Sequence, residues 1–248
     1  MTLSVVSHGQ SDLVCALVAA LSVPGAASIV KLVVTSNVPA LDDFSGLIDS
    51  ALSYPFELKL IENAKPIGFG ANQNQAFRHC STEHFCIINP DIELVRDPFI
   101  ALAQLLTQPG VGIAYPRQVD ASFKLLDFER KLVTPASLWC RYIGLQRCQP
   151  QAGAPVDWVS GALMAFKSSV FQSLSGFDER YFMYCEDVDI CLRAQLAGYQ
   201  LAKADIAVIH HTRRSTLKNR QHLMWHLRSL LRLWGSEPYR QFKKSRDR

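Results

Sequence analysis

The first half of the chain alternates between short apolar runs and longer stretches in which apolar residues recur at helical spacing. The apolar runs predict four buried strands, at residues 3–6, 29–34, 57–61 and 85–88. The intervening stretches predict helices at residues 11–21, capped by Ser11 or Asp12, and at residues 41–52. Buried strands that alternate with helices are typical of a largely parallel, doubly wound α/β sheet. We therefore expect a Rossmann-like domain whose ligand lies at the carboxyl ends of the strands.

The second half of the chain has a weaker pattern. After a short apolar run at residues 112–114, residues 117–155 carry prolines and aromatic side chains in no regular order. The remainder predicts strands at residues 156–166 and 204–210, a helix at 185–197 and an amphipathic basic helix at 221–234. A length of 248 residues with 48% hydrophobic residues suits one α/β domain with a full core. A basic, helical C-terminal tail follows this domain.

Charge is unevenly distributed along the chain. Residues 212–248 hold 11 Lys and Arg against 2 Asp and Glu, whereas residues 1–211 hold 15 against 20. Trp225, Trp234 and several leucines lie among these basic residues, a composition that suits a helix on an anionic membrane surface. A helix that packs on the domain and exposes a basic face would give the same pattern. No recognition motif accompanies the charge, so nucleic acid is not an expected partner.

Cysteine usage and the N-terminal sequence bear on the compartment. Seven cysteines without a C-x-x-C pair argue against a disulfide framework or a zinc site and favour a reducing cytosol. No basic segment precedes an apolar start, so we expect no signal peptide. Residues 13–30 are uncharged, but Pro24-Gly25 and serines interrupt them, and a helix, a turn and a strand explain them better than a membrane span. We expect a cytoplasmic protein, peripheral at the inner face of the plasma membrane if the tail binds lipid.

Two candidate metal ligands follow predicted strands. Asp91, in Asn89-Pro90-Asp91, comes directly after the strand at 85–88, at the edge where such sheets bind ligands. A carboxylate there can bridge Mg²⁺ or Mn²⁺ to a diphosphate, although an aspartate before a turn also serves as a cap. His210 ends the strand at 204–210, and it could be a further ligand or a structural histidine.

The helix predicted at 185–197 begins with three carboxylates, Glu186, Asp187 and Asp189. Asp189 lies one helical turn before Arg193 and can pair with it. Glu186 and Asp187 remain next to an aromatic loop, where partial burial would raise the pKa of a carboxylate towards that of a general base. The alternative is an acidic cluster without chemistry, which the helix dipole favours at this position.

Two further patterns suit binding. Residues 68–74 (GFGANQN) open a predicted helix, where small residues allow a close approach to a ligand and the helix N-terminus attracts anions. A tight turn with an asparagine cap explains the same residues. Trp158 offers an apolar face that can stack against a sugar, or it fills the core.

Together these patterns resemble the inverting family 2 glycosyltransferases with a GT-A fold, especially the rhamnosyltransferase-like members. The resemblance covers roughly residues 3–216 and rests on GFGANQN (68–74), INPDIEL (88–94), DWVSGALMAF (157–166), GFDERYFMYCEDVDICLR (176–193) and IHHTRRS (209–215). It implies a GT-A domain over residues 1–216, with a nucleotide-binding part up to about residue 115 and an acceptor and catalytic part beyond it. Residues 217–248 would form a basic amphipathic helix and tail.

The resemblance also implies roles for individual residues. Asp187 would be the catalytic base, with Glu186 in reserve, and Asp91 and His210 would hold the metal. Contacts to the donor are implied for Ser7, His8, Gly9, Gly68, Asn74 and Asn89. Contacts to the acceptor or the sugar are implied for Asp157 and Trp158.

The implied reaction is a single displacement that moves a sugar from a nucleotide diphosphate to an acceptor hydroxyl. The favoured donor is dTDP-L-rhamnose, and the acceptor would be a glycan or a lipid-linked sugar of a cell-surface polysaccharide. The family usually has Asp-Asn after the second strand, whereas this chain has Ser36-Asn37, and His8-Gly9 replaces an aromatic-Asn pair. The base therefore need not be uracil.

Two other functions fit part of the pattern. A nucleotidyltransferase of similar fold would need a Lys- or Arg-rich glycine loop after the first strand, which this sequence lacks. A non-catalytic sugar-nucleotide-binding domain would not need the acidic pair Glu186-Asp187, which this sequence has.

Overall fold

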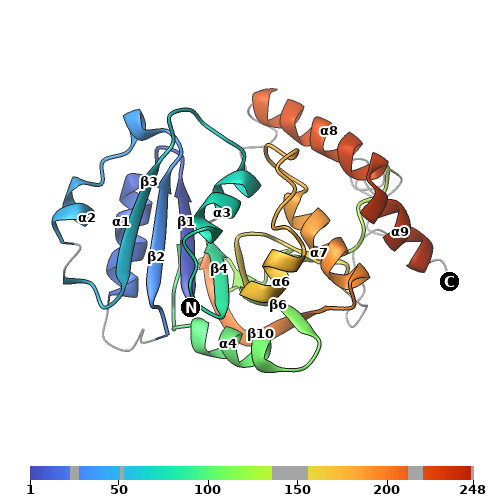
Figure 1. Ribbon diagram of the computed structural model, residues 1–248, viewed down its shortest axis with the longest axis horizontal. Coiled ribbons are helices and arrows are strands. Elements are labelled where there is room, and N and C mark those ends of the chain that lie inside the picture. Colours follow the sequence, from blue (N-terminus) through green and yellow to red (C-terminus); the bar gives the residue numbers. More distant parts are fainter. Residues whose placement is uncertain (23–27, 51–52, 136–155, 212–219, 247–248) are drawn as a thin grey trace.

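The computed structural model describes residues 1–22, 28–50, 53–135, 156–211 and 220–246 (Figure 1). The expected turn at Pro24-Gly25, the end of the helix expected at 41–52 and residues 212–219 lie outside these ranges. Among the described helices, none combines the length and the apolar composition that a membrane crossing requires.

The described strands form an eight-stranded sheet in the order β3-β2-β1-β4-β9-β6-β10-β5. These strands are β1 (Thr2–Ser7), β2 (Lys31–Ser36), β3 (Glu57–Glu62), β4 (His84–Ile88), β5 (Ile92–Glu93), β6 (Val111–Val119), β9 (Leu163–Lys167) and β10 (Gln200–His210). Neighbours run parallel from β3 to β4 and between β6 and β10. β9 is antiparallel to both β4 and β6, and β5 is antiparallel to β10. The expected mostly parallel sheet is therefore confirmed.

The strand expected at residues 156–166 is two strands. β8 (Trp158–Val159) pairs with β7 (Glu129–Arg130) in a small second sheet, and β9 then enters the main sheet. Both strands are buried, so apolar character continues through the turn at Gly161 and does not mark the break.

Helices cover both faces of the main sheet, which therefore has two cores. α1 (Ser11–Leu21) and α4 (Phe99–Thr107) contribute to the first core. α3 (Phe69–Phe77), α6 (Ser168–Ser173) and α7 (Glu186–Leu196) contribute to the second. Successive side chains of β4 alternate between the two cores, as the pleat of a strand requires. The carboxyl ends of β1, β2 and β4 remain free to carry polar side chains.

Two local expectations about the N-terminal helices were wrong. Neither Ser11 nor Asp12 caps α1, because the helix already begins at Ser11 and Gln10 is its N-cap. The helix expected at 41–52 is interrupted: a 3-10 turn, η1 (Pro39–Leu41), precedes a short helix, α2 (Ser45–Asp49). Asp42 separates the two with an extended backbone.

The described part of the C-terminal tail packs on the domain. α9 (Glu237–Arg246) contacts α7, α8 (Arg220–Gly235) contacts α9, and both helices lie at one edge of the molecule (Figure 1). Leu230, Leu233, Tyr239 and Phe242 enter the second core. The Trp234 indole N–H donates to the Val133 carbonyl at 2.8 Å. α8 is therefore a helix packed on the domain, which is one of the two alternatives left open by the sequence. The sequence pattern did not predict α9.

Replacing a buried leucine of α8 should destabilise the whole domain. Leu233 is fully buried, so we expect Leu233→Ala to lower the free energy of unfolding by about 2–5 kcal/mol. Leu231, on the same helix, is 67% exposed, and Leu231→Ala should change that free energy by less than about 0.5 kcal/mol. Chemical denaturation of both variants measures the difference, and equal effects would contradict the packing of α8.

Candidate active site

Asp91 lies just beyond the carboxyl end of β4, next to the end of β10. His210 pairs with Ile92 across the β10–β5 ladder, and the Asp91 carbonyl accepts the N–H of His211. The His210 Nε2 and the Asp91 Oδ1 are 3.5 Å apart, and both side chains are largely buried. The structure thus brings together the two residues that the sequence assigned to a metal.

The proton position on His210 favours a cation between these two side chains. Its Nδ1 lies 3.0 Å from the amide oxygen of Gln118, which accepts hydrogen bonds, so Nδ1 carries the ring proton. Burial lowers the pKa of His210 below 6.5, and the charge of Asp91 opposes this only in part. The neutral ring therefore directs a lone pair at Asp91, whose Oδ1 is buried with no hydrogen-bond partner.

An imidazole nitrogen and a carboxylate oxygen this close together fit a divalent cation. In the part of the chain that the structure describes, no group of three or more His, Cys, Asp or Glu side chains could hold a metal ion. The site would therefore supply two protein ligands and leave the other positions to phosphate oxygens and water.

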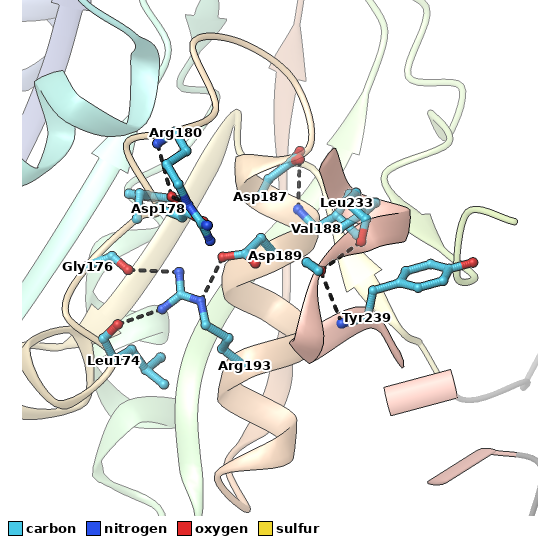
Figure 2. Close-up of polar contacts among 12 residues, drawn as sticks. Leu174, Gly176, Asp178, Arg180, Asp187, Val188, Asp189, Arg193, Leu233 and Tyr239 are labelled. Carbon is cyan, nitrogen blue, oxygen red and sulfur yellow. Dashed lines mark hydrogen bonds and ion pairs between the residues drawn. The ribbon is translucent and has the colours of Figure 1, made fainter. Parts of the chain in front are cut away.

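Glu186 and Asp187 occupy the first turn of α7 and differ in surroundings. Asp187 accepts hydrogen bonds from the N–H of Gly161 at 3.1 Å and of Val188 at 2.8 Å, and it keeps part of its surface exposed. Glu186 is 7% exposed, and its Oε2 has no hydrogen-bond partner. Figure 2 shows the Asp187 carboxylate directed away from the Asp189–Arg193 pair on the same helix. That pair was expected from the spacing and is confirmed at 2.7 Å.

The surroundings determine which of the two acids is ionised. Burial, and then repulsion from Asp187, raise the pKa of Glu186 to about 8. Burial also raises the pKa of Asp187, but the two N–H groups and the charge of Arg130 oppose this. Glu186 is therefore the acid that burial keeps protonated near neutral pH, and the hydrogen-bonded, partly exposed Asp187 is the better candidate to accept a proton.

The turn between β8 and β9 links the two parts of the site. The Gly161 N–H donates to Asp187, and the carbonyl of the next residue, Ala162, accepts the Asn89 N–H at 2.8 Å. Asp91 follows Asn89 by two residues. The metal candidates and the acidic pair therefore approach the same short turn at one edge of the sheet.

An unexpected carboxylate lies at the ends of β1 and β2. Asp42 accepts hydrogen bonds from the hydroxyls of Ser7 and Ser36, at 2.5 and 2.6 Å, and from the N–H of Gln10 at 3.1 Å. In the sequence no acid stands directly after the second strand, because Asp42 comes six residues after Ser36. The turn η1 returns it to the strand ends.

A chain of amides continues along this edge from the exposed His8. The Asn37 amide nitrogen lies 3.2 Å from the His8 Nδ1, and the Asn63 amide donates to Asn37 and to Asn72. These residues follow β1, β2 and β3 and begin α3. Their polar atoms gather where an open α/β sheet binds ligands.

Two expected donor residues have other partners. A Cβ at Gly68 would lie 2.8 Å from the Phe182 carbonyl, so this glycine allows α3 to pack against the loop before α7. Asn74 donates to the carbonyl and accepts the N–H of Phe177, both at 2.8 Å. Gly68 and Asn74 therefore fix α3 to that loop, and their expected contacts with a donor stay a prediction.

Asp157 and Trp158 lie inside the domain and present little surface to a sugar. Trp158 is 6% exposed, and its indole N–H donates to the Lys131 carbonyl at 2.8 Å. Asp157 is 4% exposed, accepts the Leu132 N–H and pairs with Arg246 of α9. The expected contact with acceptor or sugar stays a prediction, and the hydrogen bonds of both side chains go to the protein.

Comparison with known proteins identifies the family. The profile of the glycosyltransferase-like family 2 matches residues 1–226. The chain belongs to this family. It is 28% identical over 247 residues to the rhamnosyltransferase WbbL of Escherichia coli K12, which covers 92% of this chain and 90% of that protein. It is 38% identical over 97 residues to an N-acetylglucosaminyl-diphospho-decaprenol L-rhamnosyltransferase of Mycobacterium tuberculosis, but this match spans 38% of the chain and 31% of that enzyme.

Solved structures of glycosyltransferases share the fold. A mannosyltransferase from Pyrobaculum calidifontis, in complex with GDP-Man and Mn²⁺, matches with a TM-score of 0.62 at 18% identity over 93% of this chain and 64% of that one. Glucosyl-3-phosphoglycerate synthase from Mycobacterium tuberculosis, with Mg²⁺ and UDP, matches with a TM-score of 0.58 at 13% identity over 93% and 77%. The chain spans less than two thirds of the mannosyltransferase. The GT-A fold expected from the sequence is confirmed.

The raised pKa of Glu186 predicts a pH-dependent stability. Between the ordinary value of 4.5 and about 8, folded Glu186 keeps a proton that the unfolded chain has released. The free energy of unfolding should therefore fall as pH rises through this window. Glu186→Gln should flatten the profile, because the amide does not titrate, and denaturation at several pH values measures this.

The exposed Glu83 supplies the control for this prediction. Glu83→Gln should leave the slope of the wild-type profile unchanged. Parallel profiles for Glu186→Gln and the wild type would contradict a protonated Glu186.

Proposed function

We propose that this chain is an inverting, metal-dependent glycosyltransferase that moves L-rhamnose from dTDP-rhamnose to a hydroxyl of a glycan or lipid-linked acceptor, in cell-surface polysaccharide synthesis. The observation that carries the proposal is that a hydrogen-bonded, partly exposed Asp187 and the Asp91–His210 pair adjoin one turn of the chain. The relatives named rhamnosyltransferases support the choice of sugar. One of them is named for a decaprenol-linked substrate, which supports a lipid-linked acceptor.

Asp187 acts as the general base in this reaction. The N–H groups of Gly161 and Val188 keep its carboxylate ionised and oriented, while its exposed surface leaves room for an acceptor hydroxyl. The carboxylate takes the hydroxyl proton as the acceptor oxygen attacks the anomeric carbon and the nucleotide diphosphate leaves from the opposite face. Configuration at that carbon inverts. Glu186 stays protonated beside Asp187 and is the reserve candidate.

Asp91 and His210 would hold, through the metal, the diphosphate of the donor, which is the leaving group. Their facing acceptor atoms fit Mg²⁺ or Mn²⁺, and solved structures that share the fold contain one or the other ion. A divalent ion bound there supplies positive charge to the diphosphate oxygens. Asn89 lies on the same turn as Asp91 and borders the diphosphate.

Ser7, His8 and Gly9 border the nucleoside, together with two residues that follow β2. Asn37 offers amide groups beside His8, and Asp42 supplies the carboxylate that the sequence lacks directly after β2. A carboxylate and an amide can accept and donate hydrogen bonds to a pyrimidine base or a ribose. The reaction takes place on the cytoplasmic side of the membrane.

Donor binding should be visible as a metal-dependent thermal shift. In a panel of dTDP-, UDP- and GDP-sugars with Mn²⁺, we expect dTDP-rhamnose to raise the Tm most. A bound donor adds RT ln(1 + [L]/Kd) to the free energy of unfolding. Asp91→Asn should abolish the part of the shift that depends on the metal. Asp205→Asn, at a position 94% exposed, should retain it. A larger shift with another sugar nucleotide would overturn the choice of donor.

The two acids of α7 should differ in their effect on turnover. Asp187→Asn should lower kcat by about 10²–10⁴, the usual effect of losing a general base, with an unchanged donor-induced shift. Glu186→Gln should keep kcat within about tenfold of wild type, because the amide resembles the protonated acid. Transfer is measured as release of the nucleoside diphosphate. The opposite order of the two variants would make Glu186 the base.

A further inference from the structure

The outer face of α8 carries an apolar row that the described part of the chain leaves uncovered. Leu223, Leu227 and Leu231 recur every four residues, so they lie on one side of the helix with Met224 beside them. Their side chains are 41, 53 and 67% exposed, and Met224 is 52% exposed. The neighbouring side of the helix, which includes Leu230 and Leu233, is buried against the domain. The apolar surface of α8 is therefore wider than the part that the described residues cover.

Exposed basic side chains lie on α8, next to the apolar row, and on the adjoining α9. Arg220, Arg228 and Arg232 of α8 are exposed, as are Arg240, Lys243 and Lys244 of α9. Glu237 is the sole acidic residue in the sequence from 220 to 246. Figure 1 shows both helices along the outer edge of the molecule, away from the sheet. A row of leucines beside arginines is the pattern of a helix that lies in the interface of an anionic bilayer.

Charge complementarity favours an anionic bilayer over two other partners of this face, a second copy of the chain and nucleic acid. A second copy of the chain would bring the same positive charges to a two-fold interface, where they would repel. Nucleic acid would match the charge but would leave the leucines and Met224 exposed to water. An anionic lipid surface satisfies both features, because its headgroups attract the arginines and its acyl region takes up the apolar row.

The buried side of α8 contacts the segment that leads into the acidic pair. The Tyr184 hydroxyl lies 2.8 Å from the His222 Nδ1, and the rings of Phe182 and Trp225 are 4.8 Å apart. The Ser229 hydroxyl donates to the Met183 carbonyl at 2.7 Å. A surface bound to the outer side of α8 would therefore lie one helix away from residues 182–184, immediately before Glu186.

We propose that the outer face of α8 binds the anionic surface of a lipid bilayer and so holds the candidate active site beside the membrane. Each basic residue near such a surface contributes about 1 kcal/mol, equivalent to about a fivefold change in partitioning. The apolar row adds a contribution that salt does not screen.

Vesicle co-sedimentation of the full chain tests this proposal. Vesicles of phosphatidylcholine alone are compared with vesicles that also contain phosphatidylglycerol. We expect binding to the mixed vesicles and at least about tenfold weaker binding to the neutral ones. The triple variant Leu223→Gln, Leu227→Gln, Leu231→Gln should lose binding to the mixed vesicles, and Arg220→Gln, Arg228→Gln, Arg232→Gln should weaken it by about 10².

A matched variant controls for the loss of exposed apolar surface in general. Val95→Gln, Ile100→Gln, Leu125→Gln removes side chains that are 47, 50 and 60% exposed elsewhere on the molecule, and it should bind the mixed vesicles like wild type. Equal binding to both kinds of vesicle, or wild-type binding by the leucine variant, would overturn the proposal. A wild-type dimer in solution that the leucine variant converts to a monomer would also overturn it, in favour of a second copy.

Binding to the bilayer and binding of the sugar-nucleotide donor can be tested separately. The leucine variant changes exposed positions, so its free energy of unfolding should stay within about 0.5 kcal/mol of wild type. Its donor-induced thermal shift, measured without vesicles, should also match wild type. Loss of that shift together with loss of vesicle binding would indicate a folding defect, and it would count against a specific docking face.

Discussion

The hydrogen bond from the Gly161 N–H to Asp187 is the contact on which the site depends. It joins the turn between β8 and β9 to the first turn of α7, while the neighbouring Ala162 carbonyl accepts the N–H of Asn89 beyond β4. Three segments that are far apart in the sequence thus meet at two consecutive residues. A Cβ at Gly161 would lie 3.2 Å from the Asp187 Cβ, so a larger residue would crowd the base of that side chain. The glycine both donates the bond and leaves space for it.

The same contact gives two adjacent acids different surroundings. Glu186 and Asp187 share a buried helix start, and two charges there would be costly. Asp187 receives two N–H donors and the field of Arg130, whereas the Glu186 Oε2 has no hydrogen-bond partner and the pKa of that acid rises to about 8. Burial alone would make both groups poor bases at neutral pH. The hydrogen bonds favour the charged form of the acid that has exposed surface, which is the condition that a general base must meet.

The sequence predicted the parts of the site that local pattern controls. Asp91 and His210 were found because they follow buried strands, and Asp187 because it begins a periodic helix. Asp42 was missed, because a 3-10 turn returns it to the strand ends and nothing near it in the sequence marks that return. Asn74 and Trp158 carry suitable groups for a ligand, but their hydrogen bonds go to Phe177 and Lys131. Residue type shows which bonds a side chain can make, and only the folded chain shows which are already made.

The C-terminal helices bear on the site through a strained turn. Tyr184 and Cys185 have φ angles of 71° and 67°, a left-handed backbone that costs a non-glycine residue about 1–3 kcal/mol. Neither position is occupied by glycine, although this turn sets the direction of the acidic pair. The bonds that oppose the strain come from α8, whose His222 contacts the Tyr184 hydroxyl and whose Ser229 donates to the Met183 carbonyl. Because α8 also contributes Leu230 and Leu233 to the second core, the turn keeps its shape as long as that helix stays packed. Although basic and late in the sequence, α8 therefore supports the geometry of Glu186 and Asp187.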